Sequence, residues 1–405
     1  MRLKLLTSAL VLMLAGCGSE DAQKAAELET TTPQSSVSTE VTEPQLETET
    51  ERLNAWFETQ YEAELQFSPI QLSSLGRKDL YGELDDFSVA AADAALERMR
   101  TSTAEMETNF DYNKLTEEGK LSYDLWKFQL AEAEAEVPFR KNGYVFEQMG
   151  GAHTQLPTFL IGIHAVDTEK DMLDYVSRLK QSERVMDQLI EQSKANAEYG
   201  VRPPRFAFET VIEEAGKLIT GAPYDDGEDA AVFADAKTKI AALVEAGTIR
   251  ETRAVELERL VAKTLTENVR PAYQRLIAWL EEDMPNAMTV ATGVGGQPNG
   301  EAYYARRLKQ YTTTDLTPDE VHKLGLSEVA RIRAEMEAIK EAVGFEGDLR
   351  SSSSSLETAK TMIAFIILIR TKAAKPILMM RPLLSTRSMS NCQNISVFFR
   401  KPSWW

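Results

Sequence analysis

The chain has 405 residues, with 45 Lys+Arg against 63 Asp+Glu and a net charge of −18. This acidic balance argues against nucleic acid and anionic membrane surfaces as partners, because both repel negative charge. Only two cysteines occur, Cys17 and Cys392. The mature core is therefore predicted to have no disulfide, and its fold must rest on packing.

The N-terminal segment has the order of a signal peptide. Arg2 and Lys4 precede an apolar run over residues 5–14, which is too short to span a bilayer. The run leads into Leu-Ala-Gly-Cys, ending at Cys17, and this ending resembles the lipobox of bacterial lipoproteins. The resemblance implies removal of residues 1–16 and acylation of Cys17, whose several acyl chains form a durable anchor. The alternative is an ordinary secretory signal with an incidental cysteine.

Residues 17–50 are predicted to be the lipidated cysteine followed by a disordered acidic tether. Residues 18–50 are rich in Thr, Ser, Glu, Gln and Pro and contain no aromatic residue, so they cannot bury enough apolar surface to fold. Such a chain spans roughly 30 Å on average. Gly18 follows the cysteine in place of Asp, which, by resemblance to enterobacterial sorting, favours the outer membrane facing the periplasm.

Residues 51–349 are predicted to form a mainly α, multi-helical domain. Residues 168–199 carry an apolar stripe at helical spacing, with Thr168 or Asp167 as the N-cap and Gly200 as the C-terminal stop. Residues 250–283 show a second long stripe, which Pro271 should kink or divide.

A threonine cap, a proline at the first helical position and a glutamate three residues after the cap predict a helix start at Thr317-Pro318-Asp319-Glu320. Gly344 is the predicted end of that helix. Further helices are predicted over residues 88–108, 116–136, 205–220 and 228–247, whereas Gly143 to Phe146 gives one weak strand pattern.

Candidate catalytic and metal-ligating residues are few. None of the three histidines, His153, His164 and His322, is followed by glutamate, so the His-Glu-x-x-His motif of zinc peptidases is absent from the sequence. His153 and His164 flank a segment that contains Pro157, read as a loop, and a structural or surface role is favoured for both. A surface role near the start of its helix is favoured for His322. No catalytic residue, no metal ligand and no cofactor is therefore assigned to this chain.

Three other groups of residues are interpreted as structural. The glycines between residues 293 and 300 are predicted to form a turn between helices. The pairs Glu213–Glu214 and Glu281–Glu282 are predicted to lie on solvated helix faces. The tryptophans within helical patterns are predicted to belong to the core; they are Trp56, Trp126 and Trp279.

Residues 296–304, GQPNGEAYY, and residues 311–322, YTTTDLTPDEVH, resemble the middle region of the bacterial domain of unknown function 885 family. Residues 151–157, GAHTQLP, and 174–179, DYVSRL, are similar to its N-terminal part, and the resemblance covers about residues 51–349. It implies an elongated N-terminal part of a helical zincin-like fold, related to the carboxypeptidase Taq and oligopeptidase groups. It also implies a downstream His-Glu-x-x-Pro-Gly-His motif that holds a water-activating zinc, with its glutamate as the general base.

The charge changes abruptly near residue 350. Residues 1–349 carry 36 Lys+Arg and 62 Asp+Glu, whereas residues 350–405 carry 9 Lys+Arg and the single acid Glu357. Residues 350–405 are therefore interpreted as an aberrant basic tail produced by a reading-frame shift ahead of the zinc motif. The codons of residues 362–369 can encode the family-like string Asn-Asp-Arg-Phe-Tyr-Tyr-Pro-Asn in another frame. The alternative is a genuine basic tail that contacts anionic lipid.

The sequence thus leads to two hypotheses about function. The first is an envelope lipoprotein that is the N-terminal portion of a zinc peptidase, inactive as it stands because the zinc motif is absent. The second is a non-catalytic envelope lipoprotein that binds peptides or a partner protein. Both place the chain at a membrane through its lipid anchor.

Overall fold

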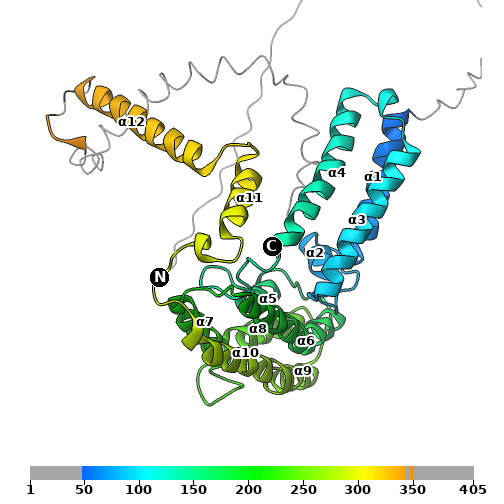
Figure 1. Ribbon diagram of the computed structural model, residues 1–405. Helices are drawn as coiled ribbons and strands as arrows, with labels where there is room; N and C mark the ends of the chain where they lie inside the picture. The colour runs from blue at the N-terminus through cyan, green and yellow to red at the C-terminus, as the bar shows by residue number, and fades with distance from the viewer. Residues whose placement is uncertain (1–47, 343, 345, 350–405) are drawn as a thin grey trace, which may run out of the picture. The chain divides into compact units, whose positions relative to one another are not determined.

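The computed structural model describes residues 48–342, 344 and 346–349 (Figure 1). These residues fold into helices joined by short connections, and no β-strand occurs among them. The predicted mainly α, multi-helical class is therefore confirmed. The α-helices of the described part are α1 (Glu49–Leu65), α2 (Pro69–Ser74), α3 (Val89–Asn109), α4 (Glu117–Glu136), α5 (Ala152–Gly162), α6 (Glu169–Tyr199), α7 (Arg205–Leu218), α8 (Ala231–Glu245), α9 (Glu251–Thr264), α10 (Arg270–Asp283), α11 (Gly300–Thr312) and α12 (Pro318–Ala342).

The first helix is fixed by a capping box. The Thr48 side chain accepts a hydrogen bond from the Glu51 backbone N–H, and the Glu51 carboxylate accepts one from the Thr48 N–H at 2.8 Å. Helix α1 therefore begins at Glu49, inside the tether that the sequence predicted to reach residue 50. The predicted signal peptide, Cys17 and the tail after residue 349 lie outside the described residues.

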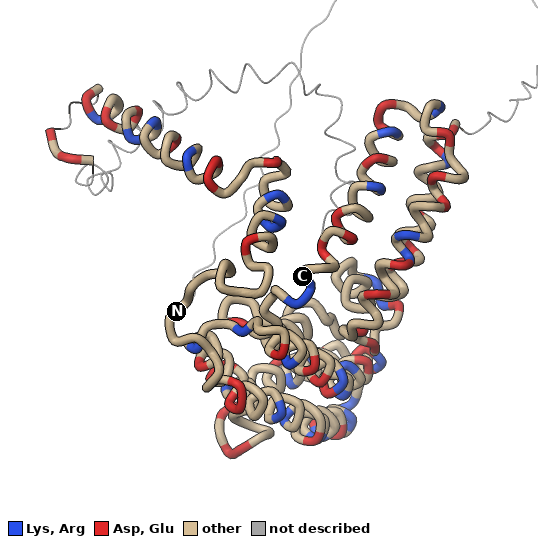
Figure 2. Tube along the Cα trace, in the orientation of Figure 1, with Lys and Arg blue, Asp and Glu red and all other residues tan. Residues whose placement is uncertain are grey.

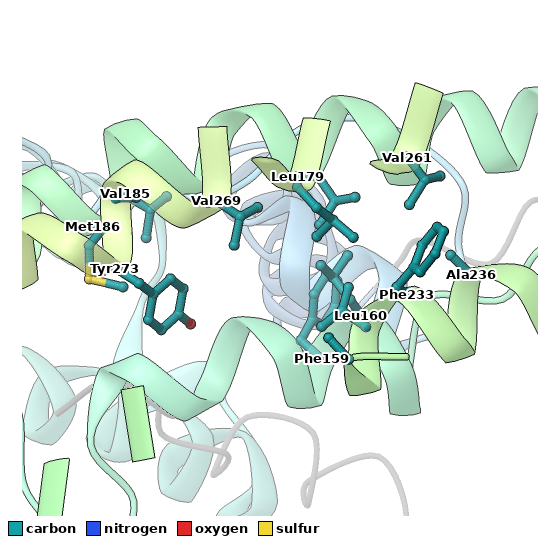
Figure 3. Close-up of a cluster of buried hydrophobic side chains, with 14 of the residues drawn as sticks. Phe159, Leu160, Leu179, Val185, Met186, Phe233, Ala236, Val261, Val269 and Tyr273 are labelled. Atoms are coloured by element: carbon teal, nitrogen blue, oxygen red, sulfur yellow. The ribbon is translucent and has the colours of Figure 1, made fainter. Parts of the chain in front are cut away.

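The main hydrophobic core is built around α6. Thr168 forms the predicted cap, and Gly200 ends the helix in the left-handed conformation with φ of 98°. Helix α6 packs against α9 and α10, while α5, α7 and α8 complete the surrounding shell. Figure 3 shows side chains from several of these helices converging, among them Leu160, Leu179 and Val261, each at most 1% exposed. No described helix combines the length and the apolar character that a membrane span requires.

The predicted interruption at Pro271 is present. Helices α9 and α10 are joined by a π-helical turn, Leu265–Val269, and Pro271 lies at the start of α10. Proline lacks an N–H donor, and its ring would clash with the carbonyl four residues earlier in a regular α-helix. The wider π turn removes that conflict and keeps Leu265 and Val269 buried.

Helices α1, α3 and α4 share a smaller core made of aromatic rings. The ring centroids of Trp56 and Trp126 lie 5.3 Å apart in an edge-on arrangement, and both rings pack against buried Phe57. Both rings are half-buried, as is Trp279, which packs on the main core, so each belongs to a core as predicted. Charged residues cover the outer faces of these helices (Figure 2), with inter-helix ion pairs such as Arg98–Glu64 at 2.8 Å.

An irregular segment, residues 82–87, is held by a ladder of polar side chains on one face of α6. Gln181 donates to the Gly82 carbonyl at 2.8 Å and accepts from the Leu84 N–H at 3.1 Å. Arg184 and Gln188 continue the pattern along the helix, bonding the carbonyls of Leu84 and Asp85 and the N–H of Phe87. The segment has no strand partner, so these side chains satisfy its backbone groups.

Arg178 forms the first step of this ladder and is fully buried. Its guanidinium donates to the Glu83 carbonyl at 2.9 Å, to Ser73 Oγ at 2.8 Å and to the Pro69 carbonyl at 3.3 Å. A fourth N–H donates to Nδ1 of His164 at 2.8 Å. One α6 side chain thus joins α2, residue 83 and the residues that follow α5.

Helices α11 and α12 lie at the C-terminal end of the described region. Helix α11 is tied to α4 by Arg306, which pairs with Glu132 at 2.9 Å. Helix α12 has the predicted start, because Thr317 caps it and Glu320 accepts from the Thr317 N–H at 2.8 Å. Gly344 follows it with φ of 70°. Ile339 alone among the residues described in α12 is buried.

Candidate functional site

A small cavity lies beside the segment predicted as a weak strand, Gly143 to Phe146. That prediction is wrong, because residues 143–146 form turns and irregular backbone rather than a strand. The cavity is lined by Gly143, Tyr144, Val145, Phe146, Ser193, Asn196, Val201, Pro203, Phe208 and Leu280. Its lining combines apolar side chains with a few hydroxyl and amide groups, and the enclosed space is about large enough for a single water molecule.

The polar groups of the lining also hold the cavity wall in place. Asn196 of α6 donates to the Gly143 carbonyl at 3.0 Å. Ser193, one turn earlier, accepts from the indole N–H of Trp279 in α10 at 3.1 Å. The cavity is therefore fixed to the main core rather than carried on a loose loop.

The glycine-rich run after residue 293 is hydrogen-bonded to the segment that carries this wall. Asn142, 1% exposed, donates to the Gln297 side chain at 3.2 Å and to the Pro298 carbonyl at 2.9 Å. Gln297 in turn donates to the hydroxyl of Tyr144 at 3.1 Å. The run that carries the family resemblance is thus bonded to residues 142 and 144, at and beside the cavity wall.

This run is a turn between helices, as predicted, and glycine is required at its end. A Cβ atom at Gly300 would lie 2.1 Å from the Val294 carbonyl oxygen, a distance that no side chain tolerates. The preceding Asn299 is left-handed, with φ of 54°. The tight turn leads directly into α11.

His153 is the imidazole that lies nearest to this region. It is completely buried in the first turn of α5, with its ring centroid 6.4 Å from that of Phe146 in the cavity wall. Its Nε2–H donates to the carboxylate of Glu214 in α7 at 2.9 Å, and Tyr273 donates to its carbonyl. Burial lowers the pKa of His153, and the Glu214 carboxylate offsets part of that effect.

Two sequence expectations need correction here. The residues around Pro157 form helix α5 and not a loop, because Pro157 lies inside Ala152–Gly162. The pair Glu213–Glu214 is not simply a solvated face: Glu213 pairs with Lys217 on the surface, but Glu214 turns inward to His153. The residue spacing carried no signal for this, since the partner lies 61 positions away.

His164 belongs to a separate network. Its Nδ1 accepts from Arg178, and its Nε2–H donates to the Asp171 carbonyl at 3.0 Å. Burial, together with the Arg178 charge, lowers the pKa of His164 to about 3, so the ring is neutral near pH 7. The structural role favoured for this residue agrees with these contacts.

The histidines are not gathered into one site. His322 is exposed on α12, where the sequence placed it, whereas the other two are buried in unrelated surroundings. Across residues 48–342, 344 and 346–349, no group of three or more His, Cys, Asp or Glu side chains is arranged to hold a metal ion. The residues present do not fit the zinc site that the resemblance implies.

The match to a family model over most of the chain defines the class of protein. The family model described as "Bacterial protein of unknown function (DUF885)" matches residues 69–367, and the chain belongs to this family. None of the curated proteins matches the chain.

A solved structure is similar in fold. It is a crystal structure of a protein from Colwellia psychrerythraea that carries the description of a lipoprotein. The TM-score is 0.63 at 18% sequence identity, and the match covers 84% of this chain. The chain spans 61% of the length of that protein. The shared feature is the fold.

We predict that the buried His153 depends on Glu214 but not on Glu213. Replacing Glu214 by Ala leaves the buried N–H of His153 without its acceptor, and this should lower the free energy of unfolding by about 1–2 kcal/mol. The loss lies in the lower part of the range for an unsatisfied buried group, because water can reach the partly exposed Glu214 site. Glu213→Ala is the matched control and should cause no measurable change. Urea denaturation at pH 7.5 measures both. Equal destabilisation by the two variants would contradict this assignment.

Proposed function

We propose that this chain is a lipid-anchored protein of the bacterial cell envelope and the N-terminal, non-catalytic portion of a peptide hydrolase. Family membership over residues 69–367 is the observation that carries the proposal. The resemblance of residues 296–304 and 311–322 to the family supplies the link to helical zinc peptidases. The fold is also similar to that of a longer protein described as a lipoprotein, which supports the envelope location.

The N-terminal leader has the features of a lipoprotein signal. Charge, an apolar run and the Leu-Ala-Gly-Cys ending supply what lipoprotein processing needs at Cys17. The tether after it lets the helical region remain in the periplasm, near but not in the outer membrane. Attraction to anionic lipid is not needed, and the acidic composition does not favour it.

The buried histidines of this region are already engaged by protein groups. Both ring nitrogens of His164 are engaged by protein groups, and Nε2 of His153 is engaged by Glu214. A hydrolytic zinc needs at least three convergent protein ligands and an open position for water. We therefore assign binding and support to this region, and zinc chemistry to the His-Glu-x-x-Pro-Gly-His motif that the resemblance implies.

A second candidate is an envelope lipoprotein that binds peptides or a partner protein without catalysis. The exposed apolar side chains of α12 favour it, among them Leu326 at 58% and Val329 at 65% exposed. The DNA that follows the codon of Leu349 separates the candidates. A zinc motif encoded there in any frame supports the peptidase portion, and its absence supports the binding protein.

We predict that Cys17 carries the lipid. In a lipoprotein-processing bacterial host, the wild-type chain should incorporate labelled fatty acid and remain in the outer-membrane fraction until detergent is added. Cys17→Ala should abolish both properties, because the thiol is the acylated group. Cys392→Ala, which changes the only other cysteine, is the control and should behave as the wild type. Lipid on the Cys17→Ala chain would refute the assignment.

We also predict that purified residues 18–405 bind no stoichiometric zinc and cleave no peptide, because the available imidazoles do not converge. Elemental analysis after dialysis, combined with a mixed-peptide cleavage assay with and without added Zn²⁺, makes the measurement. One tightly bound zinc per chain, with cleavage that a chelator stops and zinc restores, would overturn the division of roles.

A further inference from the structure

A titratable ring lies at the contact between helix α6 and the residues that follow α2. His164, in the connection between α5 and α6, is 1% exposed. Tyr81 stacks on the imidazole with ring centroids 4.3 Å apart, and Tyr175 of α6 meets it edge-on at 5.2 Å. A ring enclosed in this way cannot be solvated by water if it gains a charge.

Both ring nitrogens make hydrogen bonds that require the neutral form. Nδ1 accepts from the Arg178 guanidinium at 2.8 Å, and Nε2–H donates to the Asp171 carbonyl at 3.0 Å. The added proton of an imidazolium would therefore lie on Nδ1. There it would point at a guanidinium N–H, so a hydrogen bond would become a contact between two donors that are both positively charged.

The charged groups around the ring also oppose a positive charge on it. Arg178 and Asp171 face it from α6, and Lys239 acts on it from α8, where its ammonium pairs with Asp235 at 2.7 Å. The Asp171 carboxylate is already held by Lys78 at 2.7 Å. Burial is the main cause that lowers the pKa of the ring to about 3; Arg178 and Lys239 add to it, and Asp171 acts in the opposite direction.

The same contacts join three segments of the chain. Arg178 also donates to groups of α2 and to the Glu83 carbonyl. The Tyr81 hydroxyl donates to the Ala165 carbonyl at 2.9 Å. Helix α2, the residues that follow it and the connection 163–168 thus meet at one ring. An opening that exposes the ring to water has to loosen these contacts.

We propose that this junction is an acid-sensitive latch, in which protonation of His164 releases the connection 163–168 and the residues after α2 from α6. The proton binds Nδ1 when the junction is open, because the closed junction has no acceptor for it. Acid therefore traps the open form. The closed form has its full stability above pH 6.5, the ordinary pKa of histidine, and loses stability as the pH falls from there toward 3. The inference rests on these contacts and does not depend on the proposed peptidase role.

Hydrogen exchange of the detergent-solubilised full chain at pH 7.5 and pH 5.0 tests the proposal, with the intrinsic exchange rate of each amide divided out. Each pH unit below 6.5 raises the population of the open form about tenfold, so the protection of amides in residues 78–84 and 163–168 should fall about 30-fold between the two conditions. At pH 5.0 these amides should also be less protected than those of α9 and α10, which marks a local opening.

Two variants identify the group that titrates. In His164→Asn, the side-chain carbonyl oxygen takes the place of Nδ1 as the acceptor for Arg178 but binds no proton in this pH range. The fall in protection should therefore be nearly abolished. His322→Gln replaces an exposed ring on α12 and is the control, in which the fall of about 30-fold should persist.

Three results would overturn the proposal. The first is a wild type that keeps its protection at pH 5.0, and the second is a His164→Asn variant that loses as much protection as the wild type. The third is equal protection of the latch segments and of α9 and α10 at pH 5.0, because acid would then unfold the whole region.

A pH series on the wild type covers the case in which circular dichroism shows that His164→Asn does not fold. The fall in protection should begin near pH 6.5, where a solvated histidine titrates. An onset at about pH 4, where ordinary carboxylates titrate, would contradict the proposal.

Discussion

The polar ladder on α6 is the constraint on which much of the described fold depends. Residues 82–87 adopt no regular structure, so their backbone groups need partners from elsewhere. Arg178, Gln181, Arg184 and Gln188 supply them at helical spacing, on a face next to the one that packs in the main core. One helix therefore has two functions: its apolar stripe builds the core, and its polar stripe holds the N-terminal helices to it.

Arg178 is the most demanding element of this ladder. Burial lowers its pKa to about 10, so the guanidinium is charged at neutral pH and each of its donors needs an acceptor. Two carbonyls, a hydroxyl and the neutral ring of His164 meet that need. Tyr81 completes the site by stacking on His164 at 4.3 Å and lying under the guanidinium. The arrangement requires a histidine that stays unprotonated, and burial ensures that it does.

Local signals in the sequence predicted much of this architecture. Three features depend only on residues close by in the sequence, and the structure has each of them where it was predicted: the cap at Thr168, the stop at Gly200 and the interruption at Pro271. Contacts between distant segments gave no such signal. The inward turn of Glu214, the helix through Pro157 and the anchoring of Gln297 by Asn142 depend on neighbours brought together by the tertiary fold. The polar stripe at Gln181, Arg184 and Gln188 is regular in the sequence, but nothing local points to its partners, which lie far away along the chain.

The helical region supplies rigid support and exposed surface rather than catalytic side chains. Hydrogen bonds from Asn196 and Asn142 fix the cavity wall and the turn before α11 in place, and α12 carries exposed apolar side chains. Rigid support and binding surfaces are features of the helices present, and the proposed anchor at Cys17 confines them to the envelope. Hydrolysis is proposed to belong to the His-Glu-x-x-Pro-Gly-His zinc motif and not to these helices.

Hydrogen exchange of the Arg178→Met variant tests the central role of the ladder most directly. The substitution keeps an apolar stem but removes the donors. The account predicts that amides of α2 and residues 82–87 exchange at least roughly tenfold faster, because local opening there becomes easier, while those of α9 and α10 do not change. Arg275→Met, which removes a surface pair with Asp187, is the matched control. Unchanged exchange at α2 and residues 82–87 would contradict the account.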